Sequence, residues 1–296
     1  MLLHFEEEHD AAMRLCAAAR LKPATIKRHR FPDGEIKLRL PEAMPQRVVV
    51  LRTLNQPNEK LVELLLVAQT ARASGATHLT LVAPYLAYMR QDMAFTPGEA
   101  ISQRIIGSFL ASLFDAVITV DPHLHRVATL QEAVPVPHAI ALTGAQVLSD
   151  FIAQRRQRPL LVGPDSESQQ WVAVAAARHG FDYTVCNKIR SGDRSVKIVL
   201  PPIAVAGRAV VILDDVASTG HTVAAAARLL RAAGAASIDV AVTHALFAPD
   251  ALELIREAGV GQVWSTDCIA HSTNAVGIAP LISEALQTIS PKHPST

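Results

Sequence analysis

No apolar stretch of this sequence is long enough to form a membrane-spanning helix. Half of the 296 residues are hydrophobic, but none of the apolar runs reaches the roughly 18 residues that a helix needs to cross a bilayer. The first ten residues, MLLHFEEEHD, are acidic, which is unlike a signal or transit peptide. We therefore expect a soluble cytoplasmic protein that does not associate with membranes.

The sequence is also poor in cysteine and in net charge. Its three cysteines, Cys16, Cys186 and Cys268, lie far apart and form no CxxC pair, which indicates ordinary thiols of a reducing compartment. The formal net charge is only +1, so a bulk electrostatic attraction to nucleic acid is not expected. The length suggests about two domains, each large enough for its own core.

Several common catalytic signatures are missing as well. The sequence contains no Walker A motif (GxxxxGKS), no dinucleotide-binding GxGxxG motif and no Ser–His–Asp order. The candidates that remain are carboxylates, one or two histidines, a basic segment and a phosphate-binding loop. Such a set has no obvious nucleophile and suits phosphoryl chemistry, in which positioning and charge neutralisation by Mg²⁺ and cationic side chains dominate catalysis.

The most informative stretch is VVILDDVASTGHT, residues 210–222. Its first four residues predict a buried parallel strand, and Asp214 and Asp215 follow where this strand is expected to end. Small, hydroxyl-bearing and glycine residues then lead into a helical pattern: Ser218, Thr219, Gly220, His221 and Thr222. Helix N-termini bind anions, and ligands of open α/β sheets bind beyond the carboxyl ends of the strands. The stretch therefore predicts a sugar-phosphate site.

A similar unit occurs earlier in the chain. Two pairs of segments match: residues 48–53 with residues 210–215, and residues 72–76 with residues 231–235. The matches favour two α/β domains related by duplication over a chance likeness of two βαβ units. The first copy has Arg52 and Thr53 in place of the two acids. We expect one domain at residues 1–144 and a second at residues 145–296, with the last helix packing on the first domain.

The first half of the chain carries three groups of polar candidates on turns and loops. They are Phe31, Asp33 and Glu35 on a Pro-Asp-Gly hairpin turn, Arg90, Gln91 and Asp92 on a loop, and His123 after a predicted strand. A plain turn, a solvated loop and a histidine that binds no metal are the alternatives. Pro97 and Glu99 predict the N-terminus of the helix that follows this loop.

The second half adds an acid and a basic segment. Asp165 follows a predicted strand (LLVGP) at a position suited to metal or phosphate binding, and a helix cap is the alternative. Residues 187–194 form a polar, basic segment of flexible character. Three cations there could close over phosphates and stabilise a charged transition state. A solvated hairpin tip fits the pattern equally well.

Residues 210–222 resemble the phosphoribosyl-pyrophosphate loop that phosphoribosyltransferases share with phosphoribosyl-pyrophosphate synthetases. The motifs FPDGE, YMRQDMAFTPGEAISQR, VITVDPHLH, GPD and Lys188-x-Arg190 occur in the order found in ribose-phosphate diphosphokinases. The similarity covers residues 28–289 and is especially close to the archaeal-type branch of that family. It implies an α/β protein of two tandem phosphoribosyltransferase-like domains, each a mainly parallel sheet flanked by helices.

The resemblance also implies a reaction, in which ATP and ribose 5-phosphate give 5-phosphoribosyl 1-pyrophosphate and AMP with Mg²⁺ as the metal. It implies ribose 5-phosphate binding by Asp214, Asp215, Ser218, Thr219, Gly220, His221 and Thr222, ATP binding by Phe31, Asp33, Glu35, Arg90, Gln91 and Asp92, metal binding by His123 and Asp165, and catalysis by Lys188 and Arg190. It further implies a homo-oligomer, because the hairpin residues would reach the ATP of a neighbouring subunit.

Departures from the family pattern affect two loops. Glu167 stands in the loop after the GPD motif where glycine is usual, and its charge should weaken phosphate binding unless it points away or meets Mg²⁺. Met93 and Ala94 replace basic residues after the RQD motif. Two alternatives remain: a phosphoribosyltransferase, which the RQD, DPH and KxR motifs disfavour, and a non-catalytic homologue that binds synthetase subunits, which Lys188 and Arg190 disfavour.

Overall fold

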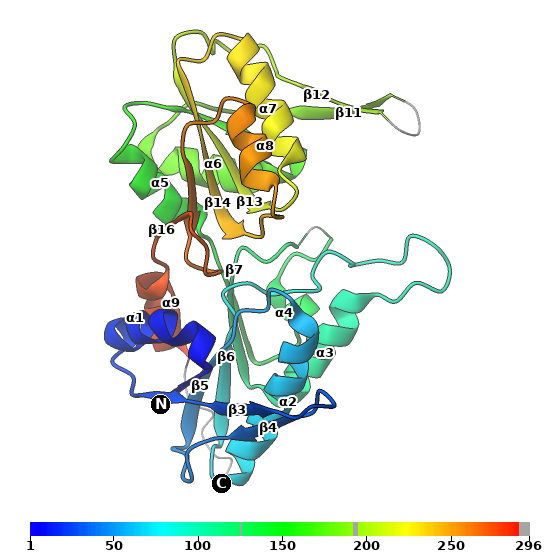
Figure 1. The fold of residues 1–296 in the computed structure, drawn as a ribbon, viewed down its shortest axis with the longest axis vertical. Helices are drawn as coiled ribbons and strands as arrows, with labels where there is room; N and C mark the ends of the chain where they lie inside the picture. The colour runs from blue at the N-terminus through cyan, green and yellow to red at the C-terminus, as the bar shows by residue number, and fades with distance from the viewer. Residues whose placement is uncertain (125, 192–194, 290–296) are drawn as a thin grey trace. The chain divides into compact units, whose positions relative to one another are not determined.

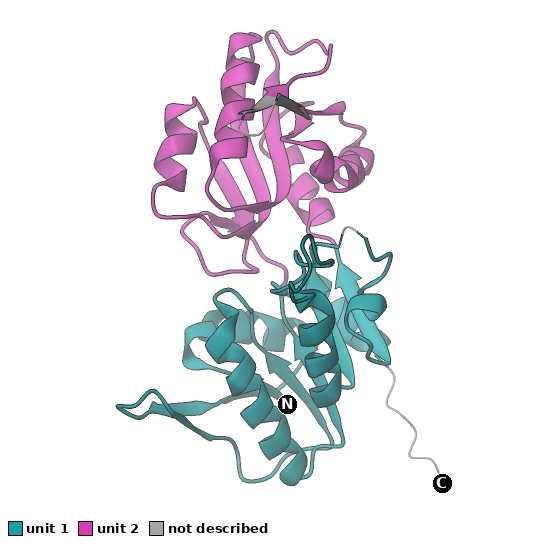
Figure 2. Cartoon of the chain, turned by 90° about the vertical axis from the view of Figure 1, so that its right-hand side faces the viewer, with its two compact units in different colours: residues 1–142, 279–296 teal, residues 143–278 magenta. Residues whose placement is uncertain are grey.

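Two compact units divide the chain (Figure 2). Unit 1 consists of Met1–Leu142 together with the chain from Ala279, and unit 2 consists of Thr143–Ile278. The division thus falls two residues before the expected boundary, and the closing helix belongs to unit 1. The computed structural model describes residues 1–124, 126–191 and 195–289, with residues 188–191 and 195–197 described by their backbone alone.

Unit 1 is built on a six-stranded sheet whose neighbouring strands all run parallel. From edge to edge the strands are β2 (Pro23–Thr25), β1 (Leu2–His4), β5 (Arg47–Leu51), β6 (His78–Val82), β7 (Ala116–Val120) and β8 (His138–Leu142). The helical elements are η1 (Glu6–Glu8), α1 (His9–Ala19), α2 (Pro57–Ala73), α3 (Ser102–Leu113), α4 (Leu130–Ala133) and α9 (Ala279–Thr288) (Figure 1). The five residues of β7, AVITV, are all buried and mostly apolar, as expected for a sheet covered on both faces.

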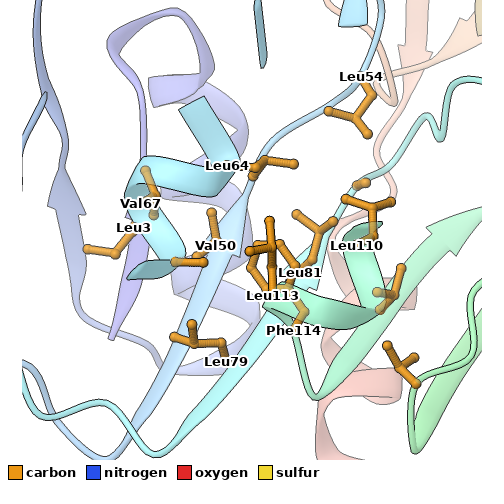
Figure 3. Packing of buried hydrophobic residues seen from close by; sticks show 14 of the residues in the cluster. Leu3, Val50, Leu54, Leu64, Val67, Leu79, Leu81, Leu110, Leu113 and Phe114 are labelled. Carbon is orange, nitrogen blue, oxygen red and sulfur yellow. The ribbon is translucent and has the colours of Figure 1, made fainter. Parts of the chain in front are cut away.

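The main core of unit 1 lies between this sheet and helices α2 and α3. Leu64 of α2 and Leu110 of α3 belong to the same buried cluster as Val50 of β5 and Leu81 of β6 (Figure 3). The strand residues of this cluster recur at every second position, since Val48 accompanies Val50 on β5. Because side chains alternate between the two faces of a strand, one face of the sheet receives these helices.

The closing helix α9 packs against α1 in unit 1. The guanidinium of Arg47 also donates to the Ile289 carbonyl, just after this helix, at 2.9 Å.

The start of α3 differs from the sequence-based prediction. The prediction that this helix begins at Pro97 is wrong, because the helix begins at Ser102. The carboxylate of Glu99 instead accepts from the backbone N–H groups of residues 95 and 96, at 2.7 and 3.2 Å, and so closes a turn before the helix.

Unit 2 repeats the parallel sheet with the same strand order. Its strands are β10 (Tyr183–Val185), β9 (Leu160–Gly163), β13 (Ala209–Ala217), β14 (Ser237–Ala245), β15 (Val263–Thr266) and β16 (Asn274–Val276). Its helical elements are α5 (Ala145–Ala153), η2 (Ser166–Ser168), α6 (Gln169–His179), α7 (His221–Ala232) and α8 (Ala251–Glu257). Val210 and Ile212 pack with α7 and α8, whereas Val211 and Leu213 pack with α5 and α6, so helices cover both faces.

Each unit also carries an antiparallel hairpin. In unit 1 it is β3 (Lys27–Arg30) with β4 (Ile36–Arg39), and in unit 2 it is β11 (Asn187–Ser191) with β12 (Ser195–Val199). A constant shift of 160 residues relates His9 to Gln169, Pro23 to Tyr183 and the register pair Arg28–Leu38 to Lys188–Ile198. The duplication therefore extends through the whole first part of each unit. Within the described residues, no helix combines the length and the apolar composition that crossing a membrane requires.

Candidate active site

The two adjacent acids of unit 2 lie inside a strand rather than after its end. β13 continues through Asp214 and Asp215 to Ala217, because β14 is equally long and stays paired with it up to Ala217 and Ala245. The expectation that the strand ends before the acids is therefore wrong by four residues. The acids still occupy the carboxyl end of a central parallel strand, which is where ligands bind in open α/β sheets.

Three carboxylates of unit 2 influence one another at this edge of the sheet. Asp214 and Asp215 come from β13, and Asp165 directly follows Pro164 at the end of the neighbouring strand β9. Asp215 and Asp165 are only 3% and 7% exposed, and the backbone N–H of Asp215 donates to Oδ1 of Asp214 at 3.0 Å. Burial, together with the negative charges of Asp215 and Asp165, raises the pKa of Asp214 well above its usual value. The two acids of β13 are therefore candidates to accept hydrogen bonds from hydroxyl groups of a ligand.

The loop after β13 leads directly into the 12-residue helix α7. Gly220 precedes the helix with φ of +77°, a left-handed conformation that glycine adopts without strain. A Cβ atom there would lie 3.1 Å from the Ala251 carbonyl oxygen and 3.2 Å from Ile255. Thr219 and His221 are exposed, while Ser218 and Thr222 are half-buried. The backbone N–H groups at the start of α7 and these side chains form a cradle suited to an anion.

Asp165 itself performs the capping role that the sequence left open. Its Oδ1 accepts from the backbone N–H of Glu167 at 3.0 Å, and its carbonyl accepts from Oγ of Ser168 at 2.5 Å. A Cβ atom on Gly163 would collide with that hydroxyl, so glycine permits this tight turn. Glu167 is exposed. Metal binding by Asp165 remains a prediction.

Residues 187–191 of the basic segment of unit 2 form a β-strand. Lys188 and Arg190 lie in β11, opposite Ile198 and Val196 of β12, so this part of the segment is a hairpin strand rather than a loop. The side chains of these two residues, and residues 192–194, lie outside the part of the chain that the structure describes. The proposed catalytic roles of these two residues remain predictions.

In unit 1, the FPDGE motif forms the tip of hairpin β3–β4, as the turn residues predict. The Phe31 N–H donates to the Glu35 carbonyl at 2.8 Å, and Oδ1 of Asp33 accepts from the Glu35 N–H at 3.1 Å. Gly34 has φ of +94°. Phe31 is 38% exposed. Its ring meets the His29 ring edge-on at a centroid distance of 4.7 Å, and Nζ of Lys37 lies 5.9 Å from its centroid.

The RQD loop is fixed by its own contacts and by one residue that the sequence did not point to. The amide of Gln91 donates to the Met93 carbonyl at 3.1 Å, while Arg90 is exposed. Asp92 is 7% exposed and accepts from Nη1 of Arg126 at 2.6 Å. The Arg126 side chain is 53% exposed, so a buried carboxylate anchors a guanidinium that still faces solvent. No local motif marks Arg126, because it meets Asp92 from 34 residues away.

The two residues predicted to bind metal belong to different units. His123 follows β7 in unit 1 and Asp165 follows β9 in unit 2. In the part of the chain that the structure describes, no three His, Cys, Asp or Glu side chains come together as a metal centre. The acids present are nevertheless of the kind that Mg²⁺ uses, since this ion is usually bound by one or two carboxylates plus substrate phosphates and water.

Two family models match the chain, the N-terminal domain of ribose phosphate pyrophosphokinase over residues 1–113 and the phosphoribosyl transferase domain over residues 137–259. A ribose-phosphate pyrophosphokinase of Methanopyrus kandleri is 34% identical over 270 residues, covering 90% of this chain and 91% of that protein. The chain belongs to the ribose-phosphate pyrophosphokinase family. Ribose-phosphate pyrophosphokinase 1 of Archaeoglobus fulgidus, another archaeal member, is 36% identical over 87% of this chain and 89% of its own length.

The fold of the family is also found in a solved structure. A crystal structure of phosphoribosylpyrophosphate synthetase from Mycobacterium smegmatis matches with a TM-score of 0.82 and 23% sequence identity, and the match covers 97% of each chain. The predicted family, its archaeal likeness and the predicted α/β fold with mainly parallel sheets flanked by helices are therefore confirmed. The roles of individual residues remain predictions.

Proposed function

We propose that this pyrophosphokinase transfers the diphosphoryl group of Mg–ATP to the 1-hydroxyl of ribose 5-phosphate, giving 5-phosphoribosyl 1-pyrophosphate and AMP. The hydroxyl oxygen forms a bond to the β-phosphorus, the bond between that phosphorus and the oxygen bridging to the α-phosphate breaks, and the hydroxyl proton is released. The observation that carries the proposal is the juxtaposition in unit 2 of a carboxylate pair and an anion cradle at one strand end.

In this proposal the carboxyl end of β13 holds ribose 5-phosphate. Asp214 and Asp215 accept hydrogen bonds from the ribose hydroxyls, and residues 218–222 bind the 5-phosphate through backbone and hydroxyl donors. The like charge that raises the pKa of Asp214 supports this role, because donors from a sugar would stabilise both carboxylates. The exposure of Thr219 and His221 leaves the cradle open to a phosphate.

The ATP contacts are proposed to come from unit 1. Phe31 packs on adenine, Asp33 and Glu35 bind its polar edge or the ribose, and Arg90 and Gln91 complete the site. Asp92 acts through Arg126, whose exposed guanidinium it anchors and which we add as a phosphate-binding candidate. We further propose a homo-oligomer in which the hairpin tip reaches the ATP of a neighbouring subunit, so that a monomer would be poorly active.

His123 in unit 1 and Asp165 in unit 2 are each proposed to contribute to Mg²⁺ binding together with substrate phosphates. When bound, the metal ion neutralises phosphate charge and makes the β-phosphorus more electrophilic. Lys188 and Arg190, the cations of β11, stabilise the negative charge that develops on the transferred group. The protein residues therefore bind, orient and neutralise, and no covalent intermediate with the protein is required.

The decisive test is AMP formation from ATP that depends strictly on ribose 5-phosphate and Mg²⁺. We expect stoichiometric 5-phosphoribosyl 1-pyrophosphate and AMP. Pyrophosphate release that depends on a nucleobase would support a phosphoribosyltransferase instead. A well-folded oligomer without turnover would favour the non-catalytic homologue and reject the proposal.

A further inference from the structure

The hairpin that carries the FPDGE tip is attached to helix α2 by two ion pairs. Arg28 and Arg30 occupy alternate positions of β3, and they pair with Glu63 and Glu59, which are one helical turn apart on α2. Figure 1 shows β3 and β4 beside α2 in unit 1. Side chains two residues apart on a strand point to the same side, and so do side chains four residues apart on a helix, which lets Arg28 and Arg30 pair with Glu63 and Glu59.

The two pairs differ strongly in burial. The side chains of Arg30 and Glu59 are 54% and 43% exposed, and surface pairs of this kind contribute little to stability. The side chain of Glu63 is fully buried, and its two oxygens accept from two different arginines, Arg28 and Arg52. A buried carboxylate with both oxygens occupied fixes the geometry of its partners far more strongly than an exposed one.

Glu63 thereby links the hairpin to the centre of unit 1. Arg52, which directly follows β5, is 1% exposed. Its Nη1 atom also lies 3.0 Å from Oε1 of Glu7 and 3.3 Å from Oε2 of Glu8. Arg28 also donates two hydrogen bonds to the carboxylate of Glu7, at 3.1 and 3.3 Å, so Arg28 and Arg52 share Glu7 as well as Glu63. The base of the hairpin is therefore connected through charged contacts to η1, β5 and α2. The residues of β3 are exposed along its whole length, whereas β4 alternates between half-buried and exposed residues, and Leu38 packs against the core of unit 1.

We infer that Glu63 is a positioning residue for ATP, because it holds the base of hairpin β3–β4 through Arg28 and so sets where Phe31, Asp33 and Glu35 are presented. The inference rests on the proposed function only in that the hairpin tip binds ATP. Glu63 is fully buried, so the inference assigns it no contact with the substrate. The effect of Glu63 and Arg28 is transmitted through the backbone of the hairpin.

The test compares Glu63→Gln with Glu59→Gln, which makes the same change one turn away in the exposed pair. We expect Glu63→Gln to raise KM for ATP by about tenfold, within the range of coupling seen for residues that share a network. KM for ribose 5-phosphate and kcat should change by less than about twofold. Glu59→Gln should change all three by less than about twofold.

A double-mutant cycle with Phe31→Ala separates positioning from general destabilisation. If Glu63 acts through the hairpin tip, Glu63→Gln should raise KM for ATP much less in a Phe31→Ala background than in the wild-type chain. Equal effects in both backgrounds, or equal increases in both KM values, would overturn the inference. Phe31→Ala without any effect on KM for ATP would instead reject the ATP role of the tip, which belongs to the proposed function.

Arg28→Lys provides the second variant in case Glu63→Gln does not fold. Lysine keeps the positive charge beside Glu63 and Glu7 but cannot donate to both in the planar geometry of a guanidinium. We expect a smaller, ATP-selective rise in KM from Arg28→Lys, and an unchanged KM for ATP would contradict the inference.

Discussion

The end of β5 in unit 1 and the end of β13 in unit 2 occupy the same place in duplicated sheets but have opposite charge. Asp214 and Asp215 stand in unit 2 where Arg52 and Thr53 stand in unit 1. The helix that follows begins in both units after a residue in the left-handed conformation, Gln56 with φ of +52° and Gly220 with φ of +77°. The backbone differs between the two acids and their counterparts, because β5 ends at Leu51 before Arg52, whereas β13 continues through both acids to Ala217.

The surroundings of these residues also differ between the two units. In unit 1, Glu8 accepts from the Thr53 N–H at 2.8 Å, and the ammonium group of Lys60 donates to the Thr53 carbonyl at 2.7 Å. Together with the contacts of Arg52, these bonds fill the position with the protein's own groups. In unit 2 the corresponding acids repel one another, which raises the pKa of Asp214 in addition to the effect of burial. In the proposed function, hydrogen bonds from ribose hydroxyls would offset this repulsion in unit 2.

The largest effect is expected where the two hairpins differ in role. Lys188→Ala and Arg190→Ala should each lower kcat by about 100- to 1000-fold with little change in either KM, because the cations act on the transition state. Arg30→Ala changes the counterpart of Arg190 in unit 1 and should lower kcat by less than about twofold. Steady-state kinetics with both substrates varied measures this, and a large KM increase at unchanged kcat would refute the catalytic role.

The charge cluster of unit 1 predicts a pH dependence of stability. Burial raises the pKa of Glu8 to about 7, against the opposing effects of Arg52 and Lys60 and with a further rise from Glu7. Between pH 4.5 and about 7 the folded chain holds a proton that the unfolded chain has released, so the free energy of unfolding falls as pH rises over this range and levels off above it. Glu8→Gln should remove this loss, which amounts to roughly 3 kcal/mol over the full range.

Urea unfolding at pH 5 and pH 8 gives the free energy of unfolding of wild type and of Glu8→Gln. The difference between the two proteins isolates Glu8, because the contributions of the other titratable groups cancel. Far-UV circular dichroism follows both units. Tryptophan fluorescence follows unit 2 alone, because Trp171 and Trp264 both lie there, and it should show no difference between the chains. A stability difference that does not change with pH would reject the assignment to Glu8.

The acids of unit 2 should affect one substrate selectively. Asp214→Asn and Asp215→Asn are expected to raise KM for ribose 5-phosphate by about 10- to 100-fold, which corresponds to the loss of one hydrogen bond involving a charged group. ATP binding measured by calorimetry should remain within about twofold of wild type. Loss of ATP binding and ribose 5-phosphate use together would count against a ribose site at this position.

Local patterns predicted much of this molecule, and the failures have identifiable physical causes. The strand, acids and helix start at residues 210–222 could be predicted because the residues that form them are adjacent. The residue at which β13 ends could not be predicted from the sequence, because it depends on pairing with β14. The start of α3 was predicted wrongly because the Glu99 side chain caps a turn rather than a helix.

Pairs formed over long sequence distances were the other failure. Glu63 lies in a helix that contains leucine and glutamate residues, and no neighbouring residue in the sequence indicates that Arg28 and Arg52 both donate to its carboxylate. Arg126 is equally inconspicuous until it meets Asp92. One sequence signal was available: the 160-residue shift places Arg28 and Arg30 in register with Lys188 and Arg190, and it extends the duplication into the hairpins.

The smallest effect concerns the left-handed residue before each helix. Gly220→Ala should lower the free energy of unfolding of unit 2 by about 1–2 kcal/mol and raise KM for ribose 5-phosphate, because the added Cβ strains φ and presses on the Ala251 carbonyl. Gln56→Gly changes the equivalent residue of unit 1, where relief of strain and the added chain entropy of glycine nearly cancel, so stability should change by less than about 1 kcal/mol. KM for ribose 5-phosphate should then stay at the wild-type value. An increase in that KM from Gln56→Gly would mean that the unit 1 loop still contributes to sugar binding, and the division of roles between the two copies would be wrong.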